Sequence, residues 1–153
     1  MGEKVETYPY GITREWQHNK RLVIVQTQGD MSDEAVNEWA DLLLKTLSEM
    51  PEEGAFFFID DLSHPNQGIT PNAMKRGREV LSATPRTRKQ LYFAVILANS
   101  FINRLTAVLM KQFMSWNSNV VYGIFTSRED ANKWVMENMQ KEGVIENVVA
   151  NIP

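Results

Sequence analysis

The sequence predicts an α/β domain whose mostly parallel sheet opens on a β-hairpin. Short apolar runs alternate along the chain with longer segments that have helical spacing. Most of these short runs are continuous rather than alternating, which is typical of strands buried on both faces. No linker-like stretch or repeat divides the 153 residues, so we expect one domain over residues 1–153. The expected element order is β-β-α-β-α-β-α-β-α.

The hairpin and the first helix follow from local patterns. Tyr8–Gln17 alternates between apolar and polar positions, and Arg21–Gln28 is apolar and β-branched, with a polar turn between them. Ser32 is a good N-cap for a helix that Pro51 ends. The apolar positions of this helix recur at helical spacing: Ala35, Val36, Trp39, Leu42, Leu43 and Leu47.

Two buried strands flank the second predicted helix. Ala55–Ile59 and Leu91–Ala98 are continuous apolar runs too short for a helix. Thr70 is an N-cap residue type, and Pro71 suits the first helical position. The helix carries one apolar stripe: Ala73, Met74, Gly77, Val80 and Leu81. A glycine in mid-helix costs about 1 kcal/mol relative to alanine, so we expect Gly77 to pack closely on the sheet.

The C-terminal half adds a helix, a strand and a helix. Phe101–Trp116 has helical apolar spacing, with a stripe that Met110 and Met114 widen beyond one face. Val120–Thr126 is the last apolar strand. Ser127 begins a final helix, and Gly143 supplies its C-terminal stop.

Composition excludes several classes of function. The net charge of −3 is unlike that of a dedicated nucleic-acid binder. Without Cys, and with only two His, thiolate and His-rich metal sites are excluded, and no phosphate-binding glycine loop occurs. We therefore expect no metal or other cofactor. The charged N-terminus and the absence of a ~20-residue apolar segment predict a cytoplasmic protein with no integral membrane segment.

One local motif resembles a known family. The residues Phe56-Phe57-Phe58-Ile59-Asp60-Asp61-Leu62-Ser63, followed after a loop by Thr70-Pro71-Asn72-Ala73-Met74, are similar to SpoIIAA-like (STAS or STAS/Sec14-like) domains of bacterial proteins of unknown function. The basic second helix and aromatic third helix also resemble that group. Anti-sigma-factor antagonists of the family carry a phosphorylated Ser at the start of the second helix. The resemblance implies that Thr70 holds the corresponding position.

The richest polar cluster follows the first buried strand. It lies where ligands bind in open α/β sheets, at the carboxyl end of a central strand. Its candidate binding residues are Asp60, Asp61, Ser63, His64 and Thr70. A turn followed by a capped helix accounts for the same residues without a ligand. No nucleophile elbow or convergent triad is present, so we expect no catalytic residues.

Two further surfaces are candidates for binding. The window from Lys75 to Lys89 holds six basic residues against Glu79, and Lys75 and Arg78 are its candidate contacts for an acidic protein or lipid headgroups. A solvated helix face is the alternative. In the third helix, Phe101, Leu105 and Phe113 are candidates for the wall of an apolar groove or for a homodimer interface, with simple core packing as the alternative.

Two hypotheses of function follow. The first, implied by the resemblance, is a non-enzymatic regulatory or protein-interaction module with a protein partner. The second is a binder of a small hydrophobic or lipid-like ligand, which the apolar third helix and basic second helix favour.

Overall fold

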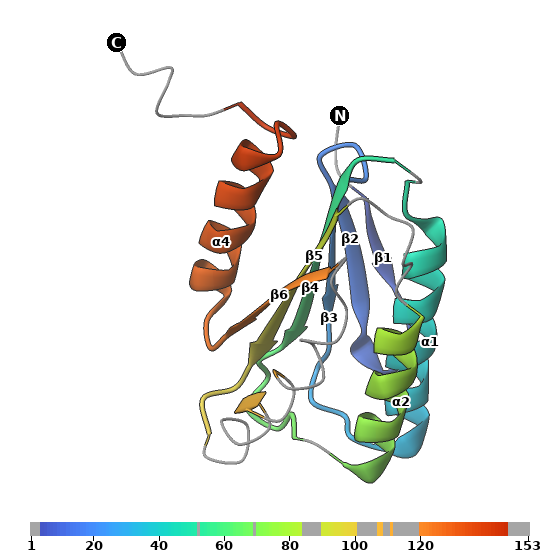
Figure 1. Ribbon diagram of the computed structural model, residues 1–153. Helices are drawn as coiled ribbons and strands as arrows, with labels where there is room; N and C mark the ends of the chain where they lie inside the picture. Colours follow the sequence, from blue (N-terminus) through green and yellow to red (C-terminus); the bar gives the residue numbers. More distant parts are fainter. Residues whose placement is uncertain are drawn as a thin grey trace.

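A computed structural model describes residues 4–51, 53–68, 70–83, 90–100, 107–108, 111 and 120–146. These residues form a six-stranded mixed sheet with helices on both faces, so the predicted α/β class is confirmed (Figure 1). The strands, which neighbour one another in sequence order, are β1 (Val5–Thr7), β2 (Thr13–Gln17), β3 (Leu22–Gln26), β4 (Ala55–Leu62), β5 (Gln90–Leu97) and β6 (Val120–Phe125). The helices are α1 (Asp33–Glu49), α2 (Pro71–Ser82) and α4 (Arg128–Lys141).

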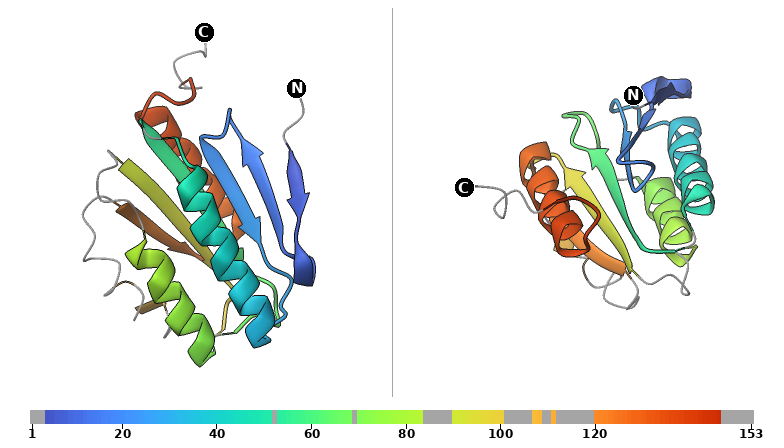
Figure 2. Two further views of the ribbon diagram at one scale, coloured as in Figure 1. Left: turned by 90° about the vertical axis from the view of Figure 1, so that its right-hand side faces the viewer. Right: turned by 90° about the horizontal axis from the view of Figure 1, so that it is seen from above.

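The parallel part of the sheet runs from β3 to β6, and β1 and β2 extend it with antiparallel pairs. Helices α1 and α2 cover one face, and α4 covers the other (Figure 2). Because parallel strands leave the sheet at the same edge, the first turns of α1 and α2 both begin beside the carboxyl ends of β3 and β4.

The N-terminal hairpin differs from the prediction in two ways. The expected strand over Tyr8–Gln17 begins only at Thr13, because Pro9–Gly11 forms a 3-10 turn. Tyr10 has φ 66° and Gly11 has φ 73°, values that no extended strand contains, and the Tyr8 amide closes the turn on the Ile12 carbonyl at 2.8 Å. The short strand β1, which the sequence analysis did not predict, pairs with β2 at the sheet edge.

Strand β4 is longer than the apolar run that predicts it. The run ends at Ile59, but the strand continues through Asp60 and Asp61 to Leu62. The expected loop of residues 60–70 therefore begins three residues later. Both carboxylates are tolerated inside the sheet because each has a hydrogen-bonding partner there.

Alternation along β4 divides the core into two layers. Phe56 and Phe58 face α1 and α2, whereas Phe57 and Ile59 face α4. Ring stacking continues across to β5 on both faces, and Phe58 lies 4.8 Å from Phe93 between ring centroids. The central strands are thus buried on both sides, as their continuous apolar sequence predicts.

Three helix starts follow their predicted caps. The hydroxyl oxygens of Ser32, Thr70 and Ser127 each accept a hydrogen bond from the backbone amide three residues later, at 3.1–3.2 Å. Gly143 follows the end of α4 with φ 74°, the left-handed conformation typical of a helix stop.

The third predicted helix falls mostly outside the described residues, and so do the candidate residues Phe101, Leu105 and Phe113. Ala107, Val108 and Lys111 are helical, and Ala107 packs against the core layer shared by α1 and α2. Arg86, Arg88 and Lys89 of the basic window also lie outside. Within the part of the chain that is described, no helix has the length and apolar character needed to cross a bilayer.

Candidate functional site

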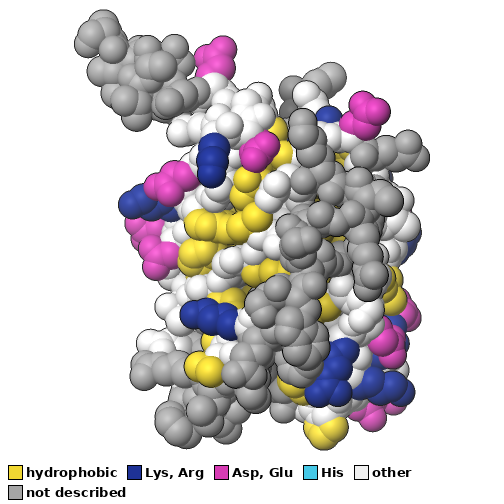
Figure 3. Space-filling view, viewed as in Figure 1, with side chains coloured by type: hydrophobic (Ala, Val, Ile, Leu, Met, Phe, Trp, Pro, Cys, Tyr) yellow, Lys and Arg dark blue, Asp and Glu magenta, His cyan; other side chains and the backbone are white. Residues whose placement is uncertain are grey.

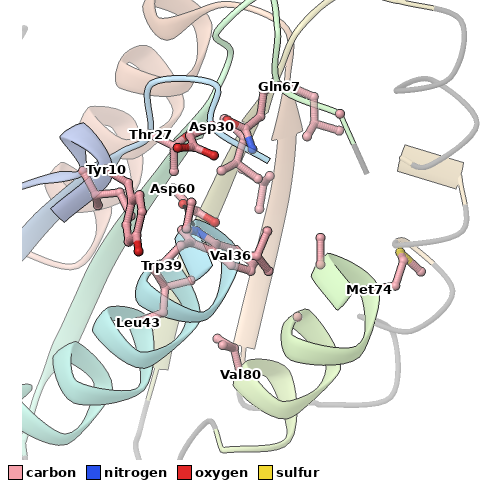
Figure 4. A pocket seen from close by; sticks show the side chains of 18 of the residues that line it. Tyr10, Thr27, Asp30, Val36, Trp39, Leu43, Asp60, Gln67, Met74 and Val80 are labelled. Carbon is pink, nitrogen blue, oxygen red and sulfur yellow. Dashed lines mark hydrogen bonds between the residues drawn. The ribbon is translucent and has the colours of Figure 1, made fainter. Parts of the chain in front are cut away.

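A cavity of about 110 Å³ lies between α1, α2 and the carboxyl half of the parallel strands (Figure 4). Its surface is mainly apolar. The side chains around it come from three sources: α1 with Val36, Trp39 and Leu43; α2 with Met74, Val80 and Leu81; and the sheet with Asp60, Leu62, Phe93, Val95 and Leu97. The exposed residues Tyr10, Gln28, Asp30 and Arg78 complete its rim.

The apolar stripe of α2 was predicted from the sequence as a core-packing face, and in the structure it forms one wall of the cavity. All five positions of the predicted stripe line the cavity, although only Val80 is buried. Among the described residues, the apolar face of α2 therefore borders a cavity and not a filled core. Unfilled apolar volume is destabilising in a protein that has no use for it.

Gly77 does not have the packing role expected of it. A Cβ built there meets only the Trp39 ring, at 4.0 Å, which is ordinary van der Waals contact. The close approach to the sheet predicted from the mid-helix glycine is thus wrong. The glycine instead enlarges the cavity at the contact of α2 with α1.

Gly77→Ala is therefore expected to stabilise the protein by about 1 kcal/mol, because helix propensity improves and nothing clashes. Urea unfolding monitored by circular dichroism measures this change. Ala73→Gly, on the same helix, serves as the matched reverse change and should destabilise it. A loss of stability in Gly77→Ala would contradict the open space beside this position.

Asp60 provides the one buried carboxyl group of the cavity wall within the described residues. Its side chain is 2% exposed, and its Oδ1 accepts a hydrogen bond from the Trp39 indole nitrogen at 3.1 Å. Burial raises the pKa of Asp60 to about 7, against a smaller lowering by the Trp39 hydrogen bond, and the neighbouring charge of Asp61 adds to the rise. This carboxyl group therefore titrates near neutral pH.

Asp61 faces the opposite side of the sheet from Asp60. Its Oδ1 accepts hydrogen bonds from the backbone and hydroxyl of Ser63, at 3.0 and 2.5 Å, and its Oδ2 pairs with Arg128 of α4 at 3.0 Å. The expected single cluster of Asp60 and Asp61 is wrong, since adjacent strand residues point to opposite faces. Asp61 and Ser63 fix the end of β4 against α4.

The loop after β4 is held down on the end of β3. A Cβ on Gly29, which has φ 85°, would lie 2.4 Å from the His64 Nδ1, so the imidazole packs directly on this glycine. The Thr27 hydroxyl donates to Gln67 Oε1 at 2.9 Å, and the Gln67 amide nitrogen contacts the Met31 sulfur. The structure thus places His64 in a turn, while Gln67 from the same loop reaches the cavity.

Thr70 and the basic residues occupy α2. Thr70 is the half-buried N-cap, and Lys75 and Arg78 are exposed. Arg76 between them pairs with Asp41 at 2.6 Å and with Glu79 at 2.9 Å. Figure 3 shows basic and acidic side chains side by side at this corner of the molecule. Over the described residues this surface carries both charges, whereas the sequence window, with six basic residues against Glu79, indicates a mainly basic one.

Sequence reasoning missed several residues of the cavity. Trp39 was assigned to the apolar stripe of α1, yet its indole nitrogen holds Asp60. Tyr10, Thr27 and Gln67 carry no motif at all. No group of three His, Asp or Glu side chains suited to a metal ion occurs in the described part of the chain.

Comparison of the chain with protein-family models, with curated proteins and with solved structures finds no match.

Proposed function

We propose that the protein binds a small, mainly apolar ligand in the cavity between α1 and α2, without chemical conversion. The observation that carries this proposal is the combination of apolar walls with one buried carboxyl group, Asp60. Ligand sites in proteins are typically concave and apolar, with a few polar groups that fix orientation. A structural carboxyl group would more simply lie at the surface, because its burial without an ionic partner is unfavourable.

The size of the cavity limits the ligand. An engineered apolar cavity of about 150 Å³ binds benzene. The volume of about 110 Å³ here therefore suits the buried part of a ligand about the size of one aromatic ring, and the rest of a larger ligand would extend past the exposed rim. This is the hydrophobic-ligand alternative of the sequence analysis, carried here by α1 and α2.

Toluene is the first probe, and chemical-shift changes in ¹H–¹⁵N spectra report where it binds. We expect the largest changes at Val36, Leu43 and Val80, which line the cavity on both helices. Gly77→Phe should fill the cavity from α2 and weaken toluene binding at least about 10-fold.

Met136→Phe is the matched control, because it adds the same ring to an exposed position of α4 on the opposite face. Its toluene affinity should stay that of the natural protein. Shift changes confined to the α4 face, or equal binding by the two phenylalanine variants, would contradict the proposal.

A second proposal is the regulatory interaction module that the SpoIIAA-like resemblance implies. The succession of β2, β3, α1, β4, α2 and β5 supports it, because it agrees with the hairpin and αβ units of that family. Exposure of Lys75 and Arg78 on α2, beyond the N-cap Thr70, supplies a contact surface.

Affinity capture with Thr70→Ala, Lys75→Ala and Arg78→Ala tests this module. A specific partner should be lost or weakened in these variants and retained by Lys133→Ala on α4. If capture is the same with all four variants, the surface of α2 is not the interface.

A further inference from the structure

We propose that the ligand is a small apolar amine whose ammonium group pairs with Asp60. This inference rests on the proposed ligand-binding function and specifies the chemical class of the ligand. It follows from three features of the described residues: a buried carboxyl group with one hydrogen-bonded oxygen, an exposed carboxylate at the rim of the cavity, and no ion pair to Asp60.

One oxygen of the Asp60 carboxyl group is hydrogen-bonded by a described residue. Trp39 donates to Oδ1 at 3.1 Å, and among the described residues Oδ2 has no hydrogen-bond partner. Asp60 lines the cavity and is 2% exposed, so a ligand in the cavity is what can reach this oxygen. A buried carboxylate favours a partner that brings both charge and donors.

Among the other polar groups at this end, Asp30 is an acceptor, and Thr27 and Gln67 are engaged with each other. In Figure 4, Asp30, Thr27, Gln67 and Tyr10 surround Asp60 at one end of the cavity, while Met74 and Val80 lie toward the other. Thr27 donates to Gln67 Oε1, and the Gln67 amide contacts the Met31 sulfur. Asp30 adds an exposed carboxylate at the rim.

The charged and titratable groups near Asp60 favour a cationic ligand. Asp30 stands at the rim as an exposed carboxylate, whereas Asp61, the next residue in β4, points to the opposite face and pairs with Arg128. Arg78 is the cationic group of the described lining, and it is exposed on α2. No described side chain neutralises Asp60 by a salt bridge. An ammonium group would supply that missing ion pair, and the apolar body of the ligand would fill the volume beside it.

Binding of an amine is then coupled to proton release. Near pH 7 the carboxyl group of Asp60 is partly protonated, because burial raises its pKa. An ammonium group binds the ionised form, so about half a proton should leave per ligand bound at pH 7, and about a tenth of a proton at pH 8, where the amine is still protonated. A neutral alcohol or hydrocarbon does not require an ionised Asp60, so its binding releases no proton.

Three probes of nearly equal size separate these chemistries: toluene, benzyl alcohol and benzylamine. Isothermal titration calorimetry at pH 7.5, repeated in two buffers of different ionisation enthalpy, gives both affinity and proton release. We expect benzylamine to bind at least about 10-fold more tightly than benzyl alcohol, as charge-assisted hydrogen bonds are stronger than neutral ones. Its affinity should rise between pH 6 and pH 8.

Asp60→Asn tests the residue itself. Asparagine keeps an acceptor for Trp39 and removes the charge. The affinity for benzylamine should therefore fall at least about 10-fold, while the affinity for toluene stays within about 2-fold of its original value. Asp61→Asn, the adjacent carboxylate on the opposite face, is the matched control and should leave benzylamine affinity within about 2-fold. Asp30→Asn should lower the affinity for benzylamine less than Asp60→Asn does, and it should make that affinity less dependent on salt.

The outcomes separate the binding of an amine from the binding of an apolar ligand, on which it rests. If toluene binds in the cavity and benzylamine binds no better, or binds without proton release, the amine is excluded while the apolar ligand stands. If none of the three probes shifts the cavity residues, the ligand-binding function itself fails. Equal loss of benzylamine in Asp60→Asn and Asp61→Asn would also overturn the assignment of Asp60.

Discussion

The stability of Asp60→Asn, measured against that of the natural protein, is expected to rise by on the order of 4 kcal/mol between pH 4 and pH 8. The folded protein raises the pKa of Asp60 from its usual 3.8 to about 7, chiefly by burial. The folded state therefore holds a proton that the unfolded chain releases across this range. Below pH 3.8, protonated Asp60 makes its full contribution to the free energy of unfolding of the natural protein. That contribution is lost as the pH rises through 7.

Urea unfolding of both proteins at each pH unit measures this difference. Asparagine does not titrate. The plot of stability against pH for Asp60→Asn therefore lacks the decrease caused by ionisation of Asp60 and keeps the contributions of all other groups. Two curves that run parallel from pH 4 to pH 8 would show that Asp60 ionises normally and is solvated in the folded protein.

Arg14→Met is expected to destabilise the protein by about 3 kcal/mol, since it breaks a buried ion-pair network. The Arg14 side chain is 3% exposed, and its guanidinium donates to Glu6 at 2.6 Å, to Glu49 at 2.8 Å and to Thr46 at 2.9 Å. It also lies over the Trp16 ring, 5.1 Å from the centroid. Through these contacts β2 is held to β1 and to α1.

Lys45→Met is the matched control, because Lys45 shares the partner Glu49 but is exposed and lies 3.9 Å from it. Lys45→Met should lower the free energy of unfolding by no more than about 0.5 kcal/mol. The Arg14 hydrogen bond also lowers the pKa of Glu6, against the opposing effect of burial, so the Glu6 carboxyl should titrate at higher pH in Arg14→Met. Equal stabilities for the two methionine variants would contradict the network.

Local features could be predicted because short-range physics decides them. Ser32, Thr70 and Ser127 are N-caps in the structure, as their residue types before helical patterns predict. The continuous runs of β4 and β5 likewise indicate strands buried on both faces. These inferences need only the neighbouring residues.

The site needed information that the sequence does not carry locally. Asp60 and Asp61 stand together in the sequence, and as polar residues they suggest the end of a strand. Tertiary partners instead keep both in β4, where alternation sends one to Trp39 and the other to Arg128. A cavity depends on the distances between helices, so the apolar stripe of α2 predicted burial and could not show that the space beside it is unfilled.

The titration of Asp60, followed by its carboxyl ¹³C shift from pH 4 to pH 9 with and without benzylamine, tests the central claim most directly. We expect a midpoint near 7 in the free protein and a lower midpoint with the amine bound, because the ammonium group stabilises the carboxylate. A midpoint below 5 in the free protein, or one that benzylamine does not move, would contradict the account of a buried carboxyl group that receives an amine.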